Sequence, residues 1–240
     1  MTFKLLPLTL LLVSTSALSA ETTEKQQLWS GDIEFGYTNL SGNTEETTTV
    51  GKFNLLRESA PWKFVGHVEG LNSEKEKERT AEKYSAFTRL EYNFTPKNYI
   101  FGRLSYEEDK FSGYDNQYTA TTGLGWNVYD LETFDWDLEG GVGYRAGELE
   151  DPLLDDEKET IVRLSTLVDW KFSETGTFTQ LLSTEMGDEN TISYSKTAIK
   201  VQVIGQISLK LSYNIKYTEE VPDGTEHADK ETVVSVTYSF

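Results

Sequence analysis

Hydrophobic and polar side chains alternate along most of this chain, and a period of two predicts β-strands with one apolar face. Residues 207–217 show the pattern most clearly, since Ile207, Leu209, Leu211, Tyr213, Ile215 and Tyr217 alternate with Ser208, Lys210, Ser212, Asn214 and Lys216. Residues 232–240 alternate in the same way and end on Phe240. A final strand that ends on an aromatic is typical of the strand that closes an outer-membrane barrel.

The same reading along the whole chain predicts twelve strands. They span 29–40, 47–57, 62–71, 83–94, 99–106, 117–129, 133–146, 160–172, 177–186, 191–203, 207–217 and 232–240. The alternation is weakest in 177–186 and 191–203. An even number of strands, most of them long enough to cross a bilayer at a tilt, indicates an all-β fold, an antiparallel transmembrane β-barrel.

The connections between these strands alternate in length. The longer ones are predicted at 72–82, 107–116, 147–159 and 218–229, and the shorter ones near 58–61, 95–98, 129–132, 173–176 and 204–206. The connections after the first and ninth strands are brief although they fall on the long side. Long loops at one end and short turns at the other are typical of outer-membrane barrels, whose short turns face the periplasm.

The large aromatic residues are sorted between the two ends of the strands. Trp29, Trp62, Trp126, Trp136 and Trp170 lie near the amino terminus or a short turn. The tyrosines at 37, 84, 106, 118, 144 and 217 lie toward the longer connections. Two aromatic girdles suit the two interfaces of a bilayer. The alternative is that these aromatics form the ordinary core of a soluble sandwich.

The first twenty residues resemble a secretory signal peptide. Lys4 supplies a positive start, residues 5–13 are apolar, and residues 14–20 are rich in small side chains. We therefore expect a signal peptide at 1–20, a short periplasmic leader at 21–28 and an outer-membrane barrel at 29–240.

The amino-acid composition argues against several classes of protein and of site. Only 37% of the residues are hydrophobic and the expected mature chain has no apolar run of helical membrane-spanning length, so a helical membrane bundle is excluded. The net charge of −18 argues against binding to nucleic acid. The chain contains no cysteine, which excludes disulfides, thiol nucleophiles and thiolate metal sites.

Three segments carry a family resemblance. They are 31–37 with the turn at 41–44, then 106–115, and then the glycine-rich 140–145. In this order they resemble the YdiY-like family of salt-induced outer-membrane proteins of Gram-negative bacteria, a family of unknown function. The resemblance covers nearly all of the expected mature chain and implies the barrel fold and the outer membrane. It offers no catalytic residues, and its link to salt concerns expression.

The charged residues on the polar faces of the strands are candidates for lining the barrel lumen. They are Glu34, Lys52, Glu69, Arg89, Glu91, Asp135, Asp137, Glu139, Arg145, Arg163, Asp169, Lys171, Lys210 and Lys216. One interpretation is a narrow channel for ions or small solutes, whose charges set its preference. The other is a network of cross-strand ion pairs that fills a structural, envelope-stabilising barrel. Charges of both signs argue against a strongly anion-selective channel.

Two further features of the sequence, its acidic loops and its two histidines, have ordinary structural explanations. Acidic residues crowd two predicted loops, Glu148, Glu150, Asp151, Asp155, Asp156, Glu157 and Glu159 in one and Glu219, Glu220, Asp223 and Glu226 in the other. Such oxygens suit Ca²⁺ or Mg²⁺, but their spacing fits no calcium-loop motif, and a solvated acidic face is favoured. His67 and His227 accompany no nucleophile motif, so an outer-membrane hydrolase is a distant alternative.

We expect no catalytic residues, cofactor or metal. The expected partners are outer-membrane lipid and lipopolysaccharide, and the barrel-assembly machinery, which would recognise the last strand ending in Phe240. A monomer is expected.

Overall fold

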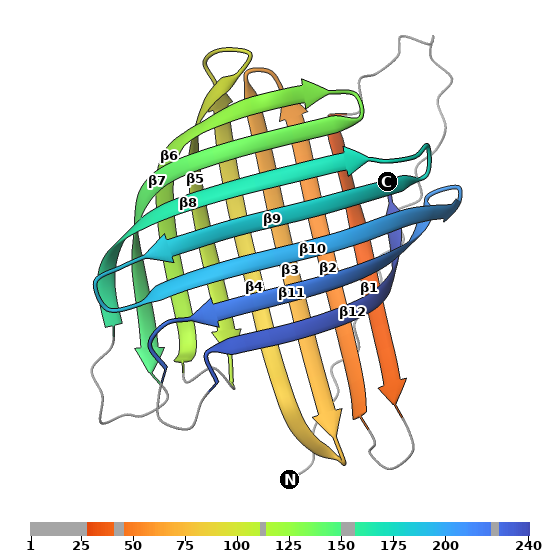
Figure 1. Cartoon of the computed structure of the whole chain (residues 1–240), viewed down its shortest axis with the longest axis vertical. Helices are drawn as coiled ribbons and strands as arrows, with labels where there is room; N and C mark the ends of the chain where they lie inside the picture. Colours follow the sequence, from red (N-terminus) through yellow and green to blue (C-terminus); the bar gives the residue numbers. More distant parts are fainter. Residues whose placement is uncertain (1–27, 41–45, 111–113, 150–156, 222–225) are drawn as a thin grey trace, which may run out of the picture.

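A closed antiparallel barrel of twelve strands makes up the protein (Figure 1). The structure is a computed structural model, and it describes residues 28–40, 46–110, 114–149, 157–221 and 226–240. The expected signal peptide at 1–20 and all but Leu28 of the leader lie outside these residues. Each strand pairs with its neighbours in the sequence, and β1 pairs with β12. No helix long and apolar enough to cross a membrane occurs among the described residues.

The strands are long, and each predicted strand corresponds to an observed one. They are β1 Trp29–Leu40, β2 Glu46–Ser59, β3 Trp62–Lys75, β4 Glu78–Asn93, β5 Asn98–Asp109, β6 Tyr114–Leu131, β7 Phe134–Leu149, β8 Glu157–Lys171, β9 Gly176–Met186, β10 Thr191–Ile204, β11 Ile207–Thr218 and β12 Ala228–Ser239. The predicted all-β class, antiparallel barrel and strand number are confirmed.

The long connections are shorter than the sequence predicted. The segment 72–82 is largely strand, because β3 continues to Lys75 and β4 begins at Glu78. The other three segments also contain strand residues. The end of β5 and the start of β6 lie in 107–116, the end of β7 and the start of β8 lie in 147–159, and the start of β12 lies in 218–229. The apolar alternation stops before the strands do, because backbone pairing continues in polar residues. Opposite charges face each other there, as in the pair Lys75 and Glu78.

The barrel closes where the chain ends. Strand β12 pairs with β1 in the register Ile33 with Tyr238 and Phe35 with Val236. Backbone hydrogen bonds continue past the strand end, from Gly31 N to Phe240 O (3.0 Å) and from Phe240 N to Gly31 O (2.9 Å). The Phe240 ring stacks on Phe53 with centroids 6.5 Å apart. The last strand therefore closes the barrel, as its alternation predicted.

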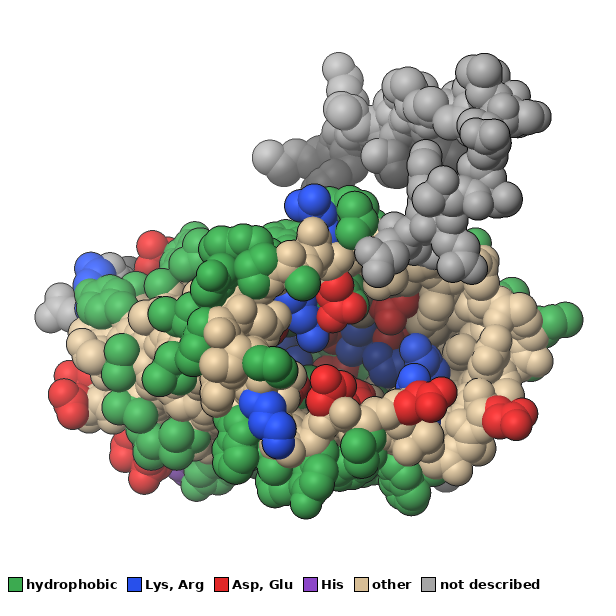
Figure 2. Space-filling model, turned by 90° about the horizontal axis from the view of Figure 1, so that it is seen from above, with side chains coloured by type: hydrophobic (Ala, Val, Ile, Leu, Met, Phe, Trp, Pro, Cys, Tyr) green, Lys and Arg blue, Asp and Glu red, His purple; other side chains and the backbone are tan. Residues whose placement is uncertain are grey.

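The polarity of the barrel is inverted relative to a soluble protein. Three consecutive residues in β1 show this, since Ile33 is 52% exposed, Glu34 is 1% exposed and Phe35 is 60% exposed. Most large hydrophobic side chains, including four of the five tryptophans, point outward in the same way. Figure 2 shows hydrophobic side chains around the outside and charged side chains in the hollow. A wall of this kind matches hydrocarbon outside and water inside.

Strands β9 and β10 depart from this rule on their outer face. Gln180 donates to Ser195 Oγ (3.3 Å) and accepts from Thr197 Oγ1 (2.7 Å), and Ser193 donates to Thr184 Oγ1 (3.0 Å). These outward polar side chains satisfy one another across the strand pair. They explain why the alternation is weak in this part of the sequence.

The glycine-rich segment of β7 allows two strands to approach closely. Gly141 lies opposite Gly123 of β6. A Cβ atom at Gly123 would lie 2.3 Å from the Gly140 carbonyl oxygen, and one at Gly141 would lie 2.5 Å from the Thr122 oxygen. Only glycine fits at this distance, and in Figure 1 the wall curves sharply here.

Candidate functional site

Two cavities lie inside the barrel. The mouth cavity, of about 870 Å³, is lined by residues near the end with the longer connections, among them Ser73, Thr80, Asp109 and Glu226. The inner cavity, of about 280 Å³, lies deeper and is lined by residues such as Arg103, Asp137 and Arg163. Both contain many charged side chains, so the interior of the barrel is polar and accessible to water.

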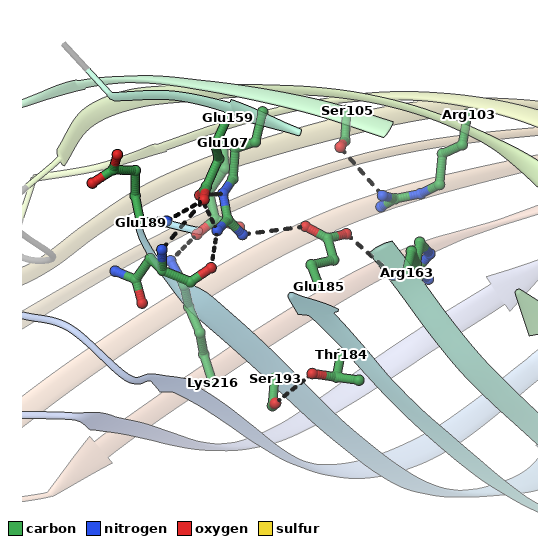
Figure 3. Close-up of polar contacts among 12 residues, drawn as sticks. Arg103, Ser105, Glu107, Glu159, Arg163, Thr184, Glu185, Glu189, Ser193 and Lys216 are labelled. Atoms are coloured by element: carbon green, nitrogen blue, oxygen red, sulfur yellow. Dashed lines mark hydrogen bonds and ion pairs between the residues drawn. The ribbon is translucent and has the colours of Figure 1, made fainter. Parts of the chain in front are cut away.

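The two cavities meet at four residues that line both of them. These are Ser85 of β4, Glu107 of β5, and Tyr194 and Lys196 of β10, which together we call the waist. Lys216 of β11 reaches Glu107 with its Nζ 2.5 Å from Oε1 (Figure 3). Strands β5 and β11 are opposite each other in the twelve-strand order, so this ion pair crosses the lumen.

Beyond the waist, arginines gather around two glutamates. Arg163 Nη1 lies 3.2 Å from Glu185 Oε1, and Arg145 Nη1 lies 3.8 Å from Glu185 Oε2. Arg145 also donates to Glu159 through Nε (3.0 Å), and all four of these side chains are buried. Figure 3 shows Glu185 reaching toward Arg163. Because buried charges are costly unless paired, this cluster links β7, β8 and β9 firmly.

Carboxylates dominate near the short turns. Glu91, Asp135, Asp137, Glu139 and Asp169 lie in the parts of β4, β7 and β8 adjacent to those turns. Arg89 is ion-paired with both Glu91 (2.9 Å) and Glu139. The Tyr99 hydroxyl donates to Glu139 Oε1 (2.8 Å), and Thr179 donates to Asp169 Oδ1 (2.5 Å). Charge is therefore sorted along the lumen, with acid near the short turns and arginines toward the middle.

A third group of pairs lies on β1, β2, β3 and β11. Lys210 Nζ is 2.7 Å from Glu34 Oε2, and Ser235 donates to the other oxygen of Glu34 (2.8 Å). Lys52 Nζ is 2.7 Å from Glu69 Oε1. Glu34 is almost completely buried, so Lys210 and Ser235 supply the partners that its charge requires.

Most of the residues predicted to line the lumen have little exposed surface. Six are buried, namely Glu34, Lys52, Glu91, Arg145, Arg163 and Lys216. Seven are partly buried, namely Glu69, Arg89, Asp135, Asp137, Glu139, Asp169 and Lys210. Lys171, the last residue of β8, is exposed.

Sequence reasoning missed several interior charges, namely Lys83, Arg103, Glu107, Glu159, Glu185 and Lys196. Glu107 and Glu159 were assigned to loops, because the strands are longer than the apolar pattern. Arg103 shares its face of β5 with Tyr99 and Phe101, two buried aromatics. Because aromatics elsewhere mark the outward face, they conceal which face of β5 points inward. Lys196 belongs to β10, where the outer face is also polar. The alternation of side chains along β5 was the one feature of the sequence that could have placed Arg103 in the interior.

Each of the two histidines has hydrogen-bond and ring partners of its own. His67 Nδ1 lies 2.5 Å from Asn54 Oδ1, its Nε2 lies 3.3 Å from Glu69 Oε2, and its ring stacks on Phe87. His227 Nδ1 donates to the Thr218 carbonyl oxygen (3.0 Å), and its ring stacks on Tyr217. Both rings have structural partners, and neither has a serine, threonine or lysine nucleophile among its recorded hydrogen-bond partners.

The predicted acidic loops are only partly described. Residues 150–156 and Asp223 lie outside the described residues. Glu159 belongs to β8 and is buried against Arg145, so its assignment to a loop was wrong. Glu148 accepts a hydrogen bond from Asn116 (2.7 Å). Within the described part of the chain, no three His, Asp or Glu side chains are grouped as a metal site.

The fold is similar to solved outer-membrane barrels. The NanC porin matches with a TM-score of 0.53 and 10% identity over 87% of this chain and 98% of that one. The translocator domain of the autotransporter NalP from Neisseria meningitidis matches with a TM-score of 0.52 and 12% identity over 91% and 90%. The COG4313 outer membrane channel from Pseudomonas putida F1 matches with a TM-score of 0.50 and 8% identity over 92% and 100%.

These likenesses, together with the apolar wall and the charged interior, define the class as an outer-membrane type of β-barrel. Residues 33–240 match the family described as "Protein of unknown function, DUF481", and the chain belongs to that family. The chain is also 28% identical over 213 residues to the uncharacterized protein YdiY of Escherichia coli strain K12, covering 88% of this chain and 82% of YdiY. The resemblance inferred from the sequence is thereby confirmed.

Proposed function

We propose that this protein is a narrow channel for ions or small solutes across the outer membrane of a Gram-negative bacterium. The observation that carries the proposal is the pair of water-accessible, charged cavities that meet at the waist inside the barrel. A barrel that served only as a scaffold has no need of a hydrated interior. The fold it shares with a porin and with an outer-membrane channel supports the same function.

A second candidate is a non-conducting barrel that stabilises the envelope. The contact between Lys216 and Glu107 favours it, because an ion pair that spans the lumen obstructs the path at the waist. The contacts that Arg89 and Arg145 make across several strands also fill the interior. These pairs stiffen the wall whether or not ions pass.

Planar-bilayer recording separates the two functions. Purified protein, shown to be folded by its heat-dependent gel mobility, is expected to give discrete conductance steps. Glu107→Gln is expected to enlarge the steps, because it breaks the ion pair across the lumen. Folded wild-type protein and folded Glu107→Gln that both remained silent would exclude the channel and leave the structural barrel.

We further propose that the protein is not an enzyme. His67 and His227 are occupied by structural contacts. The porin and the translocator domain that share this fold suggest no chemical reaction for it. Turnover of lipid or peptide by wild-type protein that disappeared in His67→Ala or His227→Ala would contradict this.

The partners follow from the surface of the barrel. The outward hydrophobic side chains suit lipid and lipopolysaccharide, and β12 with Phe240 is proposed as the segment that the barrel-assembly machinery binds. A monomer is proposed, because the strand order is closed and leaves no free strand edge.

A further inference from the structure

We infer that the waist is an anion site, which makes the channel prefer chloride and solutes carrying a carboxylate over cations. This inference rests on the proposed channel function and adds the class of solute. It follows from the charges that face one another at the narrow point between the two cavities. Several lysines gather there, although the whole chain carries a charge of −18.

Glu107 is shared by more than one lysine. Its Oε1 lies 2.5 Å from Lys216 Nζ and 3.4 Å from Lys83 Nζ. Lys83 also lies 3.5 Å from Asp109 Oδ2. Lys196 lines the same junction of the two cavities. Three lysines therefore converge from three strands on Glu107 and Asp109, while Glu69 faces Lys196 from beyond ion-pair distance.

Lys196 is the cation that remains available. Among the described residues it has no hydrogen bond or ion pair, and its side chain is exposed although it lies inside the barrel. That exposure is to water in the lumen. Glu69 and Glu107 act on its ammonium group only from beyond ion-pair distance. The ammonium group therefore still attracts a mobile anion from the water of the lumen. Tyr194, two residues away on the same face, adds a phenolic hydroxyl that can donate to the same anion.

Within the described residues, the next cation along the path also has no ion pair with a carboxylate. Arg103 donates to the Ser105 hydroxyl (3.2 Å), and its guanidinium lies 4.7 Å from the centroid of the Phe87 ring. Arg103 and Glu107 lie on the same face of β5, and Figure 3 shows Arg103 projecting into the lumen. An anion that leaves Lys196 therefore meets a second cation that is not held in an ion pair.

The mouth cavity has the opposite balance, with Glu69, Asp229 and Glu231 among its acidic lining residues. Its larger volume allows water and salt to screen these charges, whereas a permeating ion at the waist lies within a few ångströms of the lysines. The waist therefore decides selectivity. Because both signs line the rest of the wall, the expected preference for anions is moderate.

The test is the reversal potential under a KCl gradient in planar bilayers. Wild-type protein is expected to be more permeable to chloride than to potassium. Lys196→Glu is expected to lower the chloride-to-potassium permeability ratio by about a hundredfold, because two units of charge at about 6 Å in water change the permeability of each ion by about tenfold in opposite directions. Lys196→Gln is expected to lower it by about half as much on a logarithmic scale.

The matched control is Lys97→Glu, which makes the same charge change at an exposed position in the turn before β5. It is expected to leave the permeability ratio unchanged. A wild-type channel that is unselective or prefers potassium would overturn the inference while leaving the channel itself established. An effect of Lys196→Glu no larger than that of Lys97→Glu would overturn it as well.

A second measurement does not depend on conduction. Weak chloride binding broadens the chloride-35 NMR line, and wild-type protein in detergent is expected to broaden it more than Lys196→Gln. If no variant conducts, the proposed channel function is wrong. The chloride-35 line width then tests the anion site independently of conduction. Equal broadening by the two proteins would remove the site.

Discussion

Gly31 shows how the closure of the barrel depends on one side chain. A Cβ atom there would lie 2.4 Å from the Asn54 carbonyl oxygen and 2.9 Å from the Phe240 ring. The same residue exchanges backbone hydrogen bonds with Phe240. A larger residue would push the final aromatic away from the strand that it must close against. The sequence shows the glycine, but only the closed barrel shows what fills the space beside it.

Gly31→Ala is therefore expected to reduce the free energy of unfolding by about 1–3 kcal/mol, as overpacking of a tight site does. The measurement is urea unfolding of the protein in lipid vesicles, followed by tryptophan fluorescence. Gly51→Ala on the neighbouring strand is the control, since a Cβ atom there meets nothing within 4 Å. Equal stability of the two variants would show that the contact with Phe240 is unimportant.

At the scale of elements, the strands extend beyond the apolar pattern at the end with the longer connections. The hairpin of β3 and β4 turns through Glu76 and Lys77, both with positive φ, at 53° and 71°. Two such residues form the tight turn that matches the twist of a hairpin. Neither glycine nor asparagine marks this turn in the sequence, and for that reason the segment 72–82 looks like a loop.

Beyond the tyrosine girdle, this hairpin is tied to β5. Glu82 accepts from Lys110 Nζ (2.6 Å) and from Arg79. The hydrogen bond from Lys110, with a smaller contribution from Arg79, lowers the pKa of the Glu82 carboxyl below its ordinary value. A lowered carboxyl pKa means that these contacts stabilise the hairpin above the ordinary carboxyl pKa, and that they are lost as pH falls through the lowered one.

We expect Glu82 to titrate below the exposed glutamates in an NMR titration of the folded protein. Lys110→Gln is expected to raise the pKa of Glu82 toward the ordinary value, because it removes the main donor. Lys97→Gln, which changes an exposed lysine in a short turn, should have no effect. An unchanged Glu82 pKa in Lys110→Gln would contradict the assignment of this contact.

At the scale of the whole molecule, the wall is apolar outside and charged inside. The outward face carries aromatic and aliphatic side chains on every strand. On β9 and β10 these are interrupted by polar side chains that bond to one another. Water on both sides would expose the apolar outer face unfavourably. Hydrocarbon outside and water inside suit both the apolar outer face and the charged inner face.

The protein is therefore expected to stay folded and dispersed only in detergent or lipid. Dilution of detergent below its critical micelle concentration should cause aggregation, measured by light scattering, because the apolar wall then contacts water. Vesicles present during the dilution should prevent it. A mature chain that remained folded and monodisperse in plain buffer would contradict the membrane assignment of the wall.

The amino-acid sequence by itself determined the class, the number of strands and the outward face of most strands. Those features depend on local geometry, because successive side chains in a strand point to opposite faces. The strand ends and the weakly alternating β9 and β10 were harder, because polar residues there continue the ladder or occupy the outer face. The tertiary structure alone decided which interior charges meet. Glu107 and Lys216 lie on opposite strands, and their contact across the lumen depends on the tilt, stagger and narrowing of the closed barrel, which no pattern along the chain encodes.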